Sequence, residues 1–87
     1  MSLRMASIKV DREAGYIVRP DDVKDFAITA AIYLDDESKA LSNELFELYN
    51  KVSSFRRNCY GDIKPILSKY SNCEGYKTIM KFLNYHD

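Results

Sequence analysis

The sequence predicts a small, mainly α-helical domain with a β-hairpin at its N-terminus. Forty consecutive residues, 21–60, contain neither glycine nor proline, and their apolar residues recur at helical spacing. Two short β-prone runs precede this stretch. At 87 residues, the chain has the length of one domain, residues 1–87, with a thin core. Its 46% hydrophobic content is ordinary for a globular protein, which argues against a disordered chain.

The hairpin is expected over residues 7–19. Apolar residues alternate in the runs 7–10 and 16–18, and Gly15 between them can take the positive φ of a bulged hairpin loop. Because a lone hairpin is marginal in water, it is expected to pack on the helices. An alternative α+β arrangement places it in an intermolecular sheet with a second chain. Residues 1–6 are expected to be flexible or tag-derived.

A long central helix is expected over residues 22–57. Pro20 is expected to close the preceding strand, and Asp22 to cap the helix, because this choice places a carboxylate, Asp25, near the positive end of the helix dipole. Ile28 and Ile32 add a second apolar row to the helix, which is typical of a helix buried on two sides.

The polar run 35–39 leaves two interpretations open. In the first, the helix is continuous or merely kinked, and Asp35 pairs with Lys39 at i,i+4 spacing. In the second, one helix ends near Leu34 and another begins with Asp35 or Asp36 as its N-cap. The absence of glycine and proline and the unshifted heptad spacing favour the first.

The heptad spacing also predicts a homodimer. A helix over 22–57 would be about 54 Å long, whereas a compact domain of this size is roughly 30 Å across. Its apolar stripe would then lie partly uncovered and would attract a second chain. The predicted interface residues share one helix face, and they are Leu34, Leu41, Leu45, Leu48, Val52 and Phe55.

Two short helices are expected within residues 62–85. Asn58 and Gly61 are helix-stop residues that are expected to end the central helix. The first short helix covers residues 62–70, with Pro65 tolerated in its first turn. The second runs from the turn after it to about Tyr85.

The sequence contains no recognisable arrangement for catalysis or for binding a metal or cofactor. Cys59, Cys73 and His86 lack the paired spacing of a zinc site, and the acidic run 35–37 lacks the scaffold of a calcium loop. A Cys–His pair would depend on His86, next to the chain end, where helices fray. The protein is therefore predicted to be non-enzymatic, without a cofactor, and both cysteines are expected to be reduced thiols.

The formal net charge is zero, but the two halves of the chain differ. Residues 1–50 hold six basic and ten acidic side chains, whereas residues 51–87 hold seven and three. The balanced charge gives no global attraction to nucleic acid or membrane. No apolar run approaches the roughly 18 residues of a transmembrane helix, and no signal peptide is apparent, so a cytoplasmic location is expected.

These observations predict a small cytoplasmic protein–protein interaction module: a regulator, inhibitor or immunity-type protein that binds another protein. The alternative is a nucleic-acid-binding regulator that uses the basic, tyrosine-rich C-terminal half. Tyrosines at helical spacing are more often half-buried packing residues, which makes nucleic acid the less favoured partner. The basic patch of this alternative consists of Arg56, Arg57, Lys64, Lys69, Lys77 and Lys81.

Overall fold

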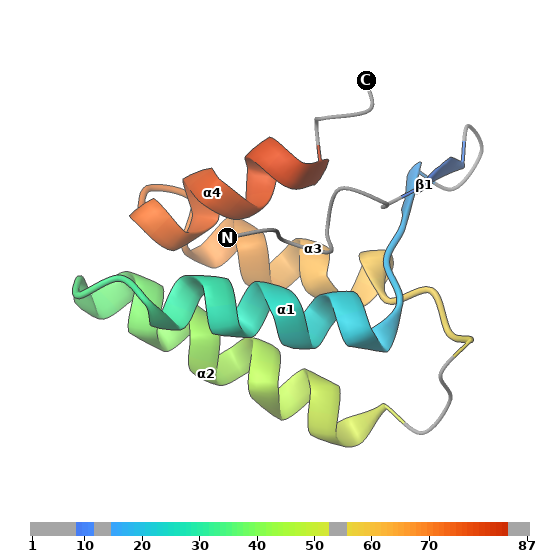
Figure 1. The fold of residues 1–87 in the computed structure, drawn as a ribbon, viewed down its shortest axis with the longest axis horizontal. Helices are drawn as coiled ribbons and strands as arrows, with labels where there is room; N and C mark the ends of the chain where they lie inside the picture. The colour runs from blue at the N-terminus through green and yellow to red at the C-terminus, as the bar shows by residue number, and fades with distance from the viewer. Residues whose placement is uncertain (1–8, 12–14, 53–55, 84–87) are drawn as a thin grey trace.

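Four helices form a small bundle in the computed structural model, which describes residues 9–11, 15–52 and 56–83 (Figure 1). The bundle measures 33 × 28 × 25 Å, and the prediction of a mainly helical domain is confirmed. Two short strands, β1 (Lys9–Asp11) and β2 (Gly15–Ile17), pair antiparallel with Val10 opposite Tyr16. They lie within the expected hairpin region, whose remaining residues 7, 8 and 12–14 fall outside the described part of the chain.

Helix α1 (Pro20–Ala31) begins two residues earlier than expected. Pro20 is its first residue, a position where the missing proline N–H costs no helical hydrogen bond. Arg19 is the N-cap, and its backbone N–H donates to the Asp22 carboxylate at 3.0 Å. The prediction that Pro20 closes the strand and Asp22 caps the helix was therefore wrong, because the proline begins the helix.

Helices α1 and α2 (Asp36–Lys51) are separate and are joined by residues 32–35. Asp35 is the N-cap of α2, and its carboxylate accepts hydrogen bonds from the Ser38 backbone N–H at 3.0 Å and the Ser38 hydroxyl at 2.9 Å. The favoured interpretation of one continuous or kinked helix over 22–57 was therefore wrong, and the two-helix alternative is the one present. The reversal lays α1 and α2 side by side (Figure 1), and their buried apolar residues therefore meet within one chain.

The C-terminal helices are α3 (Tyr60–Lys69) and α4 (Glu74–Leu83). Helix α3 begins two residues before the expected start, so Pro65 lies inside the helix and not in its first turn. The side-chain oxygen of Asn58 accepts a hydrogen bond from the Val18 backbone N–H at 2.9 Å. The segment before α1 is thereby attached to the segment before α3.

The core lies between α1, α2, α3 and α4. Ser42 joins the first two helices inside it, because its buried hydroxyl donates to the Ala27 carbonyl oxygen at 2.7 Å. The buried apolar residues are Val18, Val23, Phe26, Ala27, Ala30, Leu41, Leu45, Cys59, Ile63, Leu67, Cys73, Ile79 and Leu83.

Candidate protein-interaction site

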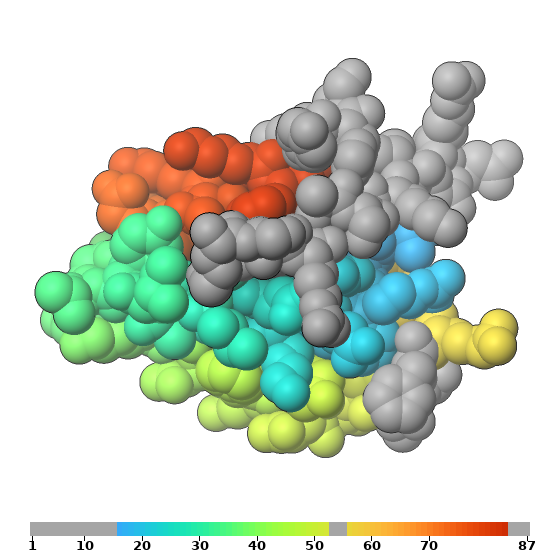
Figure 2. Space-filling view, viewed as in Figure 1, coloured from blue at the N-terminus to red at the C-terminus, as the bar shows by residue number. Residues whose placement is uncertain are grey.

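Three large apolar side chains are exposed at the junction of α1 and α2. The exposed fractions are 47% for Ile28, 65% for Ile32 and 87% for Leu34. Ile28 lies on α1, and Ile32, the C-cap of the helix, is four residues further on and so shares its face. Leu34 lies in the same connection, two residues after Ile32. Figure 2 shows this junction at the left end of the molecule. We call these three residues the apolar corner.

The outer face of α1 is exposed because the opposite face contains more apolar residues and forms the core. Val23, Phe26 and Ala30 lie on that inner face and are fully buried. Helix α1 contacts α2 and α4 on this side, which leaves the row of Ile28 and Ile32 uncovered. The expectation that α1 is buried on two sides was therefore wrong for this row. Both residues are missing from the predicted interface because a helix with two apolar rows does not specify which of them turns inward.

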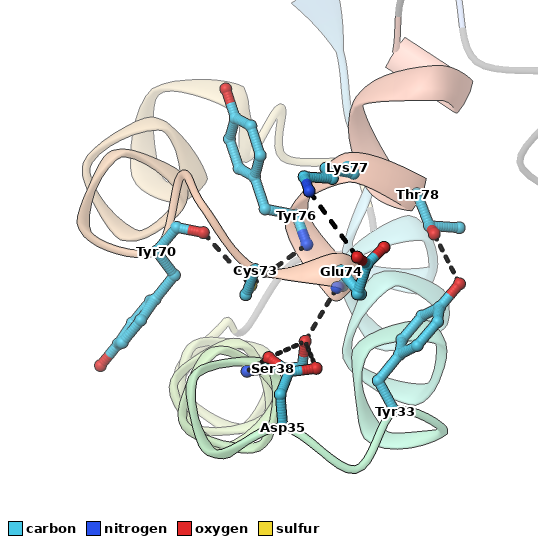
Figure 3. Close-up of polar contacts among 10 residues, drawn as sticks. Tyr33, Asp35, Ser38, Tyr70, Cys73, Glu74, Tyr76, Lys77 and Thr78 are labelled. Atoms are coloured by element: carbon cyan, nitrogen blue, oxygen red, sulfur yellow. Dashed lines mark hydrogen bonds and ion pairs between the residues drawn. The ribbon is translucent and has the colours of Figure 1, made fainter.

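The corner is held in place by hydrogen bonds to α4 (Figure 3). The Ser38 hydroxyl, which donates to Asp35, accepts a hydrogen bond from the Gly75 backbone N–H at 2.8 Å. The Tyr33 and Thr78 hydroxyls are 2.6 Å apart. Leu34 lies between these two attachment points in the sequence, so its backbone is anchored on both sides while its side chain remains exposed.

The charged residues that flank the apolar corner in the sequence are mostly acidic. Asp25 precedes Ile28 at i−3 on α1, next to Lys24 at i−4, and three acidic residues, 35–37, follow Leu34 directly and precede Lys39. Desolvation raises the pKa of Asp35, but the hydrogen bonds from the side chain and backbone of Ser38 outweigh it, so that pKa is lowered overall. An apolar surface with these neighbours suits a partner that is itself apolar and basic.

The residues of the predicted dimer interface are divided between the core and the surface of the bundle. Leu41 and Leu45 are fully buried within one chain, Leu48 and Val52 are partly buried against the core, and only Leu34 is exposed. Phe55 lies outside the described residues. The assignment of Leu41 and Leu45 to a surface interface was therefore wrong, because the two arms of an antiparallel helix pair show the same spacing as a coiled coil.

The predicted basic patch is partly neutralised by the chain's own carboxylates. Arg57 pairs with Asp62 at 2.7 Å. Lys69 pairs with Glu44 at 2.7 Å, and Lys77 lies 3.6 Å from Glu74. The remaining members of the patch are Arg56, which lies before α3, Lys64 on α3 and Lys81 on α4.

A shallow groove of about 160 Å³ lies between α3 and α4. We call it the α3–α4 groove, and its lining residues are Tyr60, Lys64, Leu67, Ser68, Tyr76, Met80 and Leu83. Lys64 is the one charged residue among them, and it makes no ion pair with any described residue. The groove is thus apolar with a single cation at its wall.

The two cysteine thiols lie in the packed interior of the protein. Cys59 and Cys73 are buried and unbridged, and burial raises the pKa of the Cys59 thiol, which lowers its reactivity.

Across the described ranges, no group of histidine, cysteine, aspartate and glutamate residues is arranged to hold a metal ion. None of the helices in these ranges has both the length and the hydrophobicity needed to cross a membrane.

No protein-family model, curated protein or solved structure matches this chain.

Proposed function

We propose that this protein is a non-enzymatic interaction module that binds another protein through the apolar corner and acts as a regulator or inhibitor in the cytoplasm. The observation that supports this most directly is the 87% exposure of Leu34 beside Ile32, at a junction anchored on both sides. Single exposed apolar residues are normal on protein surfaces, whereas large contiguous apolar patches mark interaction sites.

The energetics favour a contact at this position. Burying one leucine side chain in an interface contributes about 1.5–3 kcal/mol. Because the Leu34 backbone is anchored by its neighbours, little further ordering of the chain is needed on binding. The acidic surroundings select a partner whose apolar residues are flanked by lysine or arginine.

The test is a quantitative pull-down from the source cell with the wild-type protein, a corner variant and a surface control. The corner variant carries Ile32→Ser and Leu34→Ser, and the control carries Asn72→Ser at an exposed position in the turn before α4. We expect the corner variant to lose the bound partner and the control to retain it. Equal recovery of the partner by all three proteins would contradict the proposal, provided that circular dichroism shows equal folding.

Nucleic-acid binding is the weaker proposal, because three cations of the basic patch are paired with carboxylates of the same chain. Fluorescence anisotropy with single-stranded DNA and RNA at about 50 mM salt separates the two proposals. Binding that weakens steeply with added salt would favour nucleic acid.

A further inference from the structure

We propose that the apolar corner of one molecule docks into the α3–α4 groove of a second copy of the same chain. This names a partner for the apolar corner and so rests on the function proposed above. The contact joins two different surfaces of the chain, so two molecules can either exchange corners reciprocally in a two-fold dimer or link head to tail. It also differs from the predicted homodimer, whose central leucines lie in the core.

The groove has the size and the walls to accept a leucine side chain. An apolar protein cavity of about 150 Å³ accommodates benzene. The α3–α4 groove is of similar volume, about 160 Å³, and is lined by Leu67, Met80 and Leu83 together with two tyrosines. Leu34 is the most exposed of the large apolar side chains that the structure describes, and it comes from an anchored turn.

The charges beside the two surfaces are complementary. Lys64 lies at the groove without an ion pair to any described residue, and no carboxylate lines the groove. On the other surface, Leu34 is followed within three residues by the exposed carboxylates of Asp36 and Glu37. Seating Leu34 in the groove would bring one of these carboxylates near the Lys64 ammonium group. The zero net charge of the chain removes general repulsion between copies.

Each molecule carries both halves of this contact at different places. Leu34 lies in the α1–α2 connection, and none of the groove-lining residues comes from that connection. A molecule that docks its corner on one neighbour still offers its groove, either to that same neighbour in a two-fold dimer or to a third molecule in a head-to-tail contact. Such a contact forms a ring if the rotation closes and an open chain if it does not.

The test uses two variants that each remove one half of the contact. Leu34→Ser removes the leucine that enters the groove and leaves the groove intact, whereas Lys64→Glu leaves the corner intact and repels its carboxylates. Lys51→Glu, an exposed change of the same charge at the end of α2, is the control. Sedimentation velocity is measured from about 10 μM to about 1 mM, because a contact this small is expected to be weak.

We expect the wild type and the control to form species of two or more chains, whose share increases with concentration. Each of the two contact variants alone should remain at 10.1 kDa, the mass of one chain. Its association constant should be at least about 10-fold lower than that of the wild type. Mixed in equal amounts, the two variants should form a species of twice that mass and no larger, because only one corner and one groove remain between them.

Two results would overturn the proposal. One is a wild-type protein that stays at 10.1 kDa throughout the concentration range. The other is a self-associating wild type whose two contact variants do not assemble when mixed, which would place the contact on other surfaces. Neither result decides the function proposed above, which fails only if the corner variant retains its partner in the pull-down.

Discussion

Gly75 is the residue of α4 that packs closely against both Ala30 of α1 and Ser38 of α2. A Cβ atom at this position would lie 3.0 Å from the Ala30 Cβ and 3.1 Å from the Ser38 Oγ. The Gly75 backbone N–H also donates to that hydroxyl at 2.8 Å. A glycine in a helix costs about 1 kcal/mol relative to alanine, and here the close approach of three helices requires it.

We expect Gly75→Ala to destabilise the protein by about 1–2 kcal/mol, because the overpacking outweighs the gain in helix propensity. Gly61→Ala is the matched control in α3, where a new Cβ meets nothing within 4 Å. That variant should be more stable than the wild type by about 0.5–1 kcal/mol. Urea denaturation of both variants measures the two free energies of unfolding. Stabilisation of similar size by both changes would show that Ala30 and Ser38 make room for a methyl group at Gly75.

At the scale of the elements, an ion pair connects α2 to α3. The Glu44 carboxylate on α2 accepts hydrogen bonds from the Lys69 ammonium group, at 2.7 Å, and from the Tyr70 hydroxyl. These bonds, with that from Lys69 the larger cause, hold the pKa of Glu44 below its usual value of 4.5. The hydrogen bond to Glu44 likewise raises the pKa of Lys69.

Because its pKa is lowered on folding, Glu44 stabilises the folded state at pH values above its unfolded pKa. That contribution is lost as the pH falls through the lower, folded pKa. We therefore expect Glu44→Gln to be less stable than the wild type at neutral pH and to lose less stability between about pH 5 and pH 3. The effect should be small, since Lys69 is exposed. The midpoint of urea denaturation, measured across this range, gives the comparison.

Glu47→Gln, an exposed change one turn along α2 from Glu44, is the control for this measurement. It removes the same formal charge without touching the link to α3. If the two variants show the same dependence on pH, the ion pair contributes nothing to stability.

At the scale of the whole molecule, the reversal between α1 and α2 determines the shape. An unbroken helix over residues 20–51 would be about 48 Å long, which exceeds the 33 Å longest dimension of the bundle. The turn keeps the two apolar faces within one chain, and Asp35 and Tyr33 hold it through hydrogen bonds to Ser38 and Thr78.

Replacing this turn with three alanines, by Tyr33→Ala, Leu34→Ala and Asp35→Ala, should favour a continuous helix. The apolar faces of α1 and α2 would then be covered only by exchange with a second chain, so we expect a domain-swapped dimer of twice the 10.1 kDa chain mass. Sedimentation equilibrium at about 20 μM measures the mass, at a concentration where weak self-association is negligible. Leu34→Ala alone, which keeps both anchoring residues, should remain at the mass of one chain. A triple variant at the mass of one chain would show that packing alone keeps the turn closed.

Part of the candidate site could be predicted from the sequence. Leu34 was among the predicted interface residues, and the row of Ile28 and Ile32 was recognised as a second apolar face. The exposure of that row could not be predicted, because it depends on which face of α1 contacts α2 and α4. The α3–α4 groove was also missed, since its walls come from two helices whose side chains meet only in the folded chain.

The sequence alone determined the helical class, because apolar spacing, the lack of glycine and proline over residues 21–60 and the turn residues act locally. The tertiary structure decided where the long helical stretch divides. Local propensity over residues 32–35 is compatible with a continuous helix or a turn, and the turn is present because it buries Leu41 and Leu45 against α1 within one chain. Burial of apolar surface between distant residues exceeds the small local preferences that favoured continuity.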